Sequence, residues 1–145
     1  FHESYYDARI DHRMSIAPWR SRLPPCAQHL VDHPNDLLLK PAGLQQIARC
    51  LLALGVAPRQ ISALVAAIFN DGRHGWGHQW DLYSPELRAD FYIRLFCCQV
   101  ATRVDRAVDF NCVSTQEKGF CFNPQGCSLQ PLRSSLLLLQ QEPEP

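Results

Sequence analysis

Cysteine residues give this chain its clearest capacity for chemistry. Three of the seven cysteines, Cys112, Cys121 and Cys127, fall within the stretch 109–127. The glycine, asparagine and proline residues between them favour a loop, without a regular helix or strand. Such a loop has little apolar material to hold its shape, so we expect a metal centre or a disulfide to fix it. A fourth cysteine, Cys26, lies far upstream. We predict that these four thiols converge on one metal centre.

The number and spacing of the cysteines favour a metal over a disulfide framework. Seven is an odd number, whereas disulfide scaffolds are normally short, dense in cysteine and even in count. The spacing C-x8-C-x5-C contains no C-x2–4-C pair of the kind that holds zinc in fingers and ribbons. Thiolates that come singly from separate places suit the spread corner irons of a [4Fe–4S] cluster. A Zn²⁺ ion held by four thiolates, a disulfide and unligated thiols remain as alternatives.

Cys26 follows a pair of prolines at the expected start of a short helix over residues 26–31. Proline is tolerated in the first turn because its missing N–H has no partner there. Cys26 would then lie near the positive end of the helix dipole, which favours the thiolate that a metal requires. The alternative interpretation is a half-buried, unreactive thiol.

The other three cysteines lie in predicted helices and are not assigned to the metal. Cys50 falls beside the apolar stripe of its helix, and we interpret it as a packing or exposed thiol. Cys97 and Cys98 fall on two different stripes of one helix, and we expect both to be buried. Neighbouring residues on a helix point about 100° apart, which is poor geometry for joint ligation of one ion.

Apolar periodicity and helix-start signals predict an all-α fold. We expect a compact helical domain with an irregular cysteine-bearing loop around the metal centre. The helix predicted after the N-cap Ser84 carries two apolar stripes, so we expect it to be central and packed on both sides. A connector is predicted at 33–43. The predicted helices after it span 41–54, 58–69, 85–108 and 132–139, and Gly55 ends the first of them.

Length and composition predict one globular domain. The chain has 145 residues, of which 46% are hydrophobic and 19% charged, and its formal net charge is zero. We divide it into an arm at 1–22, the helical metal-binding domain at 23–139 and a disordered tail at 140–145. No apolar run is long enough to cross a bilayer, and no secretory signal opens the chain, so we expect a cytoplasmic protein without a membrane partner.

The order of the cysteines and helical segments resembles that of a known protein family. A cysteine after Pro24-Pro25, a mostly helical middle and three later cysteines resemble the iron–sulfur C-terminal domain of archaeal and eukaryotic DNA primase large subunits. The helical segment from Pro41-Ala42-Gly43 to Gly55 corresponds in order to one in that family. The resemblance implies a [4Fe–4S] cluster on Cys26, Cys112, Cys121 and Cys127. The family's nucleotide-holding stretch has no match here, and its last cysteines lie further apart.

Residues able to contact nucleic acid are concentrated in the segment 73–80, RHGWGHQW. With zero net charge, any such site has to be a local patch. Cationic and aromatic side chains can grip phosphates and stack on bases, whereas the alternative is a glycine-hinged loop whose tryptophans cap the core. His74 and His78 can alternatively bind a metal. The candidate nucleic-acid residues are Arg73, His74, Trp76, Trp80 and Lys118, with Arg103, Arg106 and Arg133 as further cations.

The sequence contains no catalytic motif. It lacks a phosphate-binding glycine loop, a Gly-x-Ser-x-Gly elbow and HExxH. We therefore expect a chain that is not catalytic by itself. The resemblance to the primase large subunit implies an accessory that binds DNA, RNA or nucleotide beside a catalytic primase or polymerase chain in primer synthesis. The alternatives are a zinc- or cluster-stabilised protein-interaction module without nucleic-acid binding, and a redox protein that uses the cluster for electron transfer.

Overall fold

A computed structural model describes residues 16–71, 74, 76, 84–119 and 129–140. All regular structure in these ranges is helical, which confirms the all-α prediction. Arg73, Trp80, Cys121 and Cys127 lie outside the described residues. The helices are α2 (Ala17–Arg20), α3 (Pro25–Asp32), α4 (Pro34–Leu37), α5 (Pro41–Ala53), α6 (Pro58–Phe69), α7 (Pro85–Ala101), α8 (Cys112–Glu117) and α9 (Gln130–Gln140).

Proline begins most of these helices, as the sequence predicts. Pro25, Pro41, Pro58 and Pro85 all occupy the first turn of their helices, where a missing N–H costs no hydrogen bond. Gly55 follows the end of α5 with a φ of 93°, the left-handed conformation that glycine adopts readily. These local signals explain why α3, α5 and α6 begin and end close to their predicted bounds.

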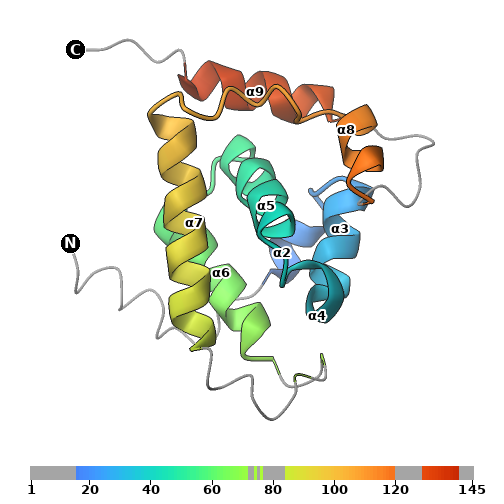
Figure 1. Ribbon diagram of the computed structural model, residues 1–145, viewed down its shortest axis with the longest axis vertical. Coiled ribbons are helices and arrows are strands. Elements are labelled where there is room, and N and C mark those ends of the chain that lie inside the picture. The colour runs from blue at the N-terminus through green and yellow to red at the C-terminus, as the bar shows by residue number, and fades with distance from the viewer. Residues whose placement is uncertain (1–15, 72–73, 75, 77–83, 120–128, 141–145) are drawn as a thin grey trace.

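Helix α5 lies at the centre of the molecule. It contacts α3, α6, α7 and α9, and Figure 1 shows α7 on one side of it, α3 on the other and α9 across one end. Leu44, Ile47 and Leu51 on α5 are fully buried, together with Leu64 of α6 and Ile93 of α7. Apolar burial of this kind is the main force that holds such a small domain together.

The connector at 33–43 contains a short helix, α4, which we did not predict. Gly43 in the first turn of α5 packs directly against it, because a Cβ at this position would collide with the carbonyl oxygen of Leu37. The glycine therefore allows α4 and α5 to approach closely.

Helix α7 ends at Ala101, seven residues before the predicted end at Val108. The chain turns away because Arg103 and Ala107 both adopt left-handed backbone conformations, with φ of 65° and 55°. Val104 and Val108 continue the apolar period of the helix, yet their side chains are 71% and 75% exposed. The periodicity predicted a continued helix where the structure has a loop.

Only one of the two apolar stripes on α7 is buried, so the prediction of a helix packed on both sides is wrong. Ile93 and Cys97 face the core, whereas Leu87 and Phe91 are 58% and 62% exposed. Cys98 shares the outer stripe and is exposed, which corrects its predicted burial. Cys97 is buried as predicted, and burial raises the pKa of its thiol to about 12, with a smaller contribution from Cys98.

The predicted cysteine loop contains a helix, α8, which corrects the expectation of irregular structure throughout 109–127. Asn111 caps it, since its side-chain oxygen accepts a hydrogen bond of 2.8 Å from the N–H of Ser114. Gly119 follows the end of α8 with a φ of 79°. Cys112 is therefore the first residue of a capped helix.

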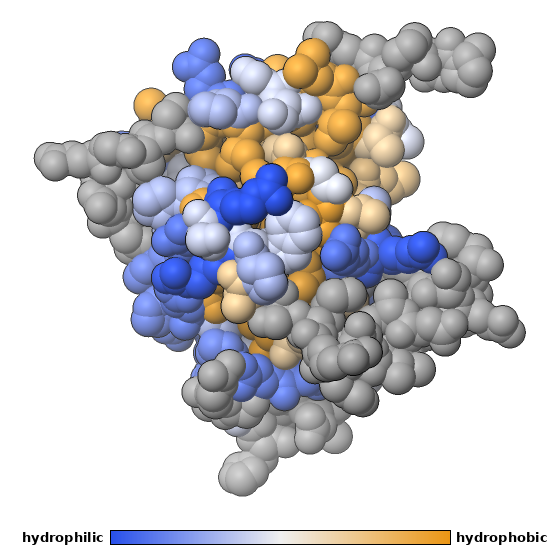
Figure 2. All heavy atoms as spheres, turned by 180° about the vertical axis from the view of Figure 1, so that it is seen from behind, coloured by the Kyte–Doolittle hydropathy of each residue, from blue (hydrophilic) through white to orange (hydrophobic). Residues whose placement is uncertain are grey.

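The ends of the domain differ slightly from the predicted boundaries. Helix α2 falls in the segment predicted as an arm, and Arg20 there pairs with Asp32 of α3 at 2.5 Å. Gln140, assigned to the tail, is the buried last residue of α9. No helix among the described residues is long and apolar enough to cross a membrane. Seen from behind, the upper half of the molecule displays apolar surface between hydrophilic residues (Figure 2).

Candidate functional site

Two of the four predicted metal ligands lie on elements that the structure brings together. Cys26 is in the first turn of α3, as predicted, and is 5% exposed. The side-chain amide of Gln46 on α5 lies 3.9 Å from Cys26 Sγ and donates to Thr115 Oγ1 of α8 at 3.4 Å. Thr115 is three residues after Cys112, on the same face of α8. The helices that carry Cys26 and Cys112, α3 and α8, therefore adjoin one another.

Cys112 is half-buried and borders a pocket of about 450 Å³. Leu129, two residues after Cys127 in the chain, lines the same pocket, as do Phe110 and Arg133. Gly119, two residues before Cys121, lies at the end of α8. The described residues on both sides of the segment 120–128 therefore belong to the same end of the molecule as Cys112.

The described residues do not by themselves complete a metal site. No group of three or more histidine, cysteine, aspartate or glutamate side chains in these ranges is arranged to hold an ion. The five described cysteines form no disulfide with one another. A four-thiolate centre at this junction needs Cys121 and Cys127, so the four-ligand assignment stays a prediction.

Cys50 is a fifth thiol close to this junction. It is fully buried on α5, one turn after Gln46, so the packing interpretation holds and the exposed one does not. Burial raises the pKa of the Cys50 thiol well above its ordinary value, and the charge of a Cys26 thiolate raises it further. Cys50 is therefore held as a neutral thiol.

A buried ion pair, which the sequence did not reveal, fixes the chain that leads into α8. Arg49 of α5 is 3% exposed and donates two hydrogen bonds to Asp105, at 2.7 and 2.8 Å. It also pairs with Asp109 at 2.8 Å, and its guanidinium lies 5.7 Å from the ring centre of Phe110. Lys118 completes the group by binding Asp109 at 2.5 Å.

The two carboxylates of this group are held in their charged form. Burial raises the pKa of Asp109, but the hydrogen bond from Lys118 and the charge of Arg49 lower it more, to about 2. Burial acts on Asp105 in the same way, and hydrogen bonds from Arg49 and the N–H of Ala107 give a net lowering of its pKa. One nitrogen of Arg49, Nη1, has no hydrogen-bond partner among the described residues.

The predicted nucleic-acid residues that the structure describes do not form one patch. Trp76 packs its ring edge-on against Phe69 at 5.8 Å and donates its indole N–H to the carbonyl of Asp71. His74 lies 3.8 Å from the Asp71 carboxylate, and its carbonyl accepts from Asn35 of α4. Trp76 therefore covers the core, as in the alternative interpretation.

Lys118 lies at the end of α8, where it pairs with Asp109. None of the contacts among the described residues links it to His74 or Trp76. The prediction grouped Lys118 with His74 and Trp76, whereas in the structure Lys118 pairs with Asp109 and the other two contact Asp71.

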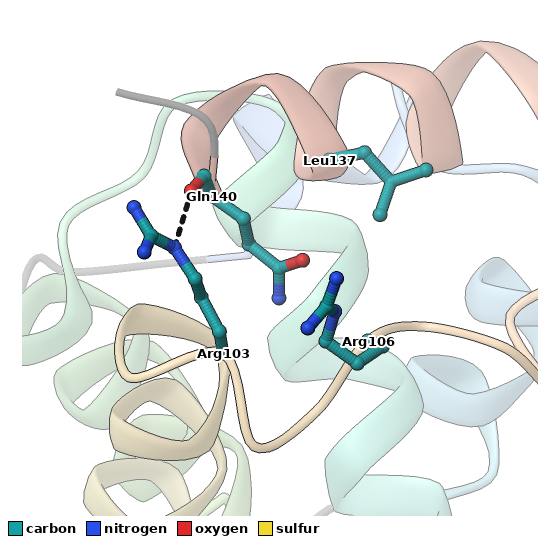
Figure 3. Close-up of a pocket in the computed structure, with 4 residues that line it drawn as sticks. All are labelled: Arg103, Arg106, Leu137 and Gln140. Atoms are coloured by element: carbon teal, nitrogen blue, oxygen red, sulfur yellow. Dashed lines mark hydrogen bonds between the residues drawn. The ribbon is translucent and has the colours of Figure 1, made fainter. Parts of the chain in front are cut away.

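The cations that face outward instead gather between the α7–α8 loop and α9. Arg103, Arg106, Leu137 and Gln140 line a pocket of about 410 Å³ there. Figure 3 shows the two arginines on either side of the Gln140 side chain. Arg103 donates from Nε to the Gln140 carbonyl at 2.8 Å, and the Gln140 amide donates to the carbonyls of Val100 and Asp105.

Arg133 brings a third guanidinium to the same loop. It projects from α9 and donates from Nε to the carbonyl of Ala107 at 2.9 Å. Together with the Gln140 contacts, this hydrogen bond attaches α9 to the chain that connects α7 and α8.

No known protein family, curated protein or solved structure matches this chain.

Proposed function

We propose that this chain is a [4Fe–4S]-binding helical domain that binds nucleic acid or nucleotide as an accessory to a catalytic polymerase such as a primase. The observation that carries the metal part is the contact of Gln46 with both Cys26 and Thr115. It joins α3 to α8, so two thiols far apart in sequence lie on adjoining elements. Cys26, Cys112, Cys121 and Cys127 would hold the cluster, which would cross-link the helices through four thiolates.

The support for nucleic-acid binding is the gathering of three arginines around one loop, of which Arg103 and Arg106 are exposed and Arg133 is half-buried. The acidic residues of the same segment, Asp105 and Asp109, are engaged by Arg49 and Lys118. A zero net charge therefore still allows a local basic surface, which is what contact with a phosphate backbone requires.

Metal content after anaerobic purification tests the cluster. The protein should be brown and contain about four irons per chain, the number in a [4Fe–4S] cluster. Cys26→Ser and Cys112→Ser should each lower the iron content, whereas the matched control Cys98→Ser, at an exposed thiol on α7, should retain it. A colourless protein with one zinc ion, or equal iron in all three variants, contradicts the proposal.

A titration with a fluorescently labelled single strand tests the nucleic-acid part. Fluorescence anisotropy at two salt concentrations should show binding that weakens as salt increases, because phosphate contacts release counterions. The absence of binding at low salt removes this part of the proposal and leaves the metal part untouched.

A protein-interaction module is the second candidate function, and the outer stripe of α7 favours it. Leu87, Phe91 and Leu95 are spaced four residues apart on one face of the helix, and all three are exposed. An apolar stripe on a helix is the surface by which an amphipathic helix of another protein commonly docks.

Substitution on the two faces of α7 tests whether this stripe is available to a partner. Phe91→Ser should change the free energy of unfolding by no more than about 0.5 kcal/mol, because the side chain is exposed. Ile93→Ala should cost about 2–5 kcal/mol, as expected for a fully buried side chain. If Phe91→Ser costs as much in urea unfolding as Ile93→Ala, the stripe packs within the chain and this candidate is wrong.

A further inference from the structure

The loop between α7 and α8 directs its charged side chains to two sides. Asp105 is buried and turns inward to Arg49, while its own N–H donates to the carbonyl of Gln99 at 2.9 Å. Arg103 and Arg106, on either side of Asp105 in the chain, are exposed. The inward carboxylate is neutralised by α5, so it does not neutralise the two outward arginines.

The backbone of this loop holds a conformation that is unfavourable for its residues. Arg103 has a φ of 65°, in the left-handed region where a residue with a side chain is less stable than glycine. Glycine does occupy the equivalent position after α5, at Gly55. A strained residue that carries a functional group often marks a binding site, and here the group is a guanidinium.

The pocket between this loop and α9 has two basic sides, a polar floor and an apolar wall. Arg103 and Arg106 provide the basic sides, the buried Gln140 provides the floor, and Leu137 provides the wall (Figure 3). No carboxylate is among the described residues that line it. Arg103 is held in place by its hydrogen bond to the Gln140 carbonyl. Arg106 has no hydrogen bond or ion pair with any other described residue.

We propose that this pocket is a phosphate subsite that binds the phosphate group of a nucleotide, with Arg106 as the main donor and Arg103 beside it. Planar guanidinium groups match the geometry of phosphate oxygens and form paired, charge-assisted hydrogen bonds with them. Leu137 offers an apolar surface for the sugar or base next to the phosphate. This inference deepens the proposed function and rests on it for the choice of ligand. It also moves the contact away from the loop at 73–80.

Isothermal titration with inorganic phosphate and with adenosine 5′-monophosphate tests the subsite. Arg106→Gln should weaken binding of both probes about tenfold, because the charge-assisted hydrogen bonds are lost. Arg106→Lys should weaken it less, since it keeps the charge and loses the planar fork. The matched control Arg94→Gln removes an exposed arginine two turns before the end of α7 and should leave affinity within about twofold.

Glu142 and Glu144 follow α9 in the sequence and are acidic, so each titration is repeated in a Glu142→Gln/Glu144→Gln chain. Absence of phosphate binding in both backgrounds overturns the inference, as does an equal loss in Arg106→Gln and Arg94→Gln. Vesicles containing phosphatidic acid distinguish a lipid phosphate. Binding to vesicles without binding to the nucleotide or to a single strand overturns the assignment to nucleotides.

Metal content measured on the same samples separates this inference from the cluster. Arg106→Gln should retain the metal content of the unaltered chain, because Arg106 is exposed and is not one of the proposed ligands. A chain without iron that still binds nucleotide through Arg106 contradicts the cluster and leaves the phosphate subsite intact.

Discussion

The inner and outer sides of the α7–α8 connection use charge in opposite ways. On the inner side, Arg49 and Lys118 engage Asp105 and Asp109, and the group as a whole is neutral. On the outer side, arginines line a pocket that has no carboxylate among its described lining residues. A segment of about ten residues thus separates charges that hold the fold from charges that face solvent.

The difference shows how a chain of zero net charge can present a basic surface. Both carboxylates of this segment, Asp105 and Asp109, pair with Arg49, so they do not neutralise the outward guanidiniums. The inner side should therefore control stability and the outer side should control binding. Variants on each side can break this division or sharpen it.

The largest expected effect comes from the inner side, at Arg49. Arg49→Met leaves Asp105 buried without its partner, and we expect the free energy of unfolding to fall by about 3–5 kcal/mol in urea titrations. Arg20→Met removes the exposed pair with Asp32 and should cost much less, because solvent screens the two charges. Equal losses in the two variants would show that burial adds nothing to the inner pair.

A double variant separates the cost of an orphaned charge from the value of the pair. Arg49→Met with Asp105→Leu replaces both charges by apolar groups, and such replacements are often neutral or stabilising. We expect it to recover a large part of the stability lost in Arg49→Met alone. No recovery would mean that the hydrogen bond that the N–H of Ala107 donates to Asp105 matters as much as the ion pair.

The sequence predicted the helical frame well because its signals are local. Pro41 and Pro58 begin their helices and Gly55 ends one, and these preferences act within a single turn. The early end of α7 has no such signal, since Val104 continues the apolar period. The chain turns there because Asp105 pairs with Arg49, 56 residues away, and a contact at that separation is invisible to a local pattern.

The candidate site was predictable only in part for the same reason. The proline before Cys26 placed that thiol in the first turn of α3, and the structure confirms it. The contact of Gln46 with α8 depends on tertiary packing. The helix at Cys112 had its own signals, since Asn111 is a typical cap and Gly119 a typical end, but the loop-like composition around them outweighed these.

A moderate effect is expected on the outer side, at Arg103. Arg103→Gly relieves the left-handed strain but removes a hydrogen bond to the Gln140 carbonyl, and each amounts to about 1 kcal/mol. Stability should therefore change by less than about 1 kcal/mol, while affinity for adenosine 5′-monophosphate should fall by several fold. A large loss of stability with unchanged affinity would assign Arg103 to the inner, structural role.

The smallest effect is expected from a change of pH acting at Asp109. Its pKa in the folded chain is about 2, below the ordinary value of 3.8, so the charged form is favoured by folding. A lowered pKa contributes stability above about pH 4, and this contribution is lost as the pH falls toward 2. The side chain is 42% exposed, so solvent screening keeps the contribution below about 1 kcal/mol.

Urea unfolding of Asp109→Asn at pH 4 and pH 2.5 measures this contribution. The variant should lose less stability between the two values than the unaltered chain, because it has no carboxylate to protonate at this position. Lys118→Met removes the hydrogen bond that lowers the Asp109 pKa and should also reduce the loss, by a smaller amount. If both variants retain the full pH dependence, Asp109 belongs with the solvent-facing charges, and the inner side is reduced to the single pair of Arg49 with Asp105.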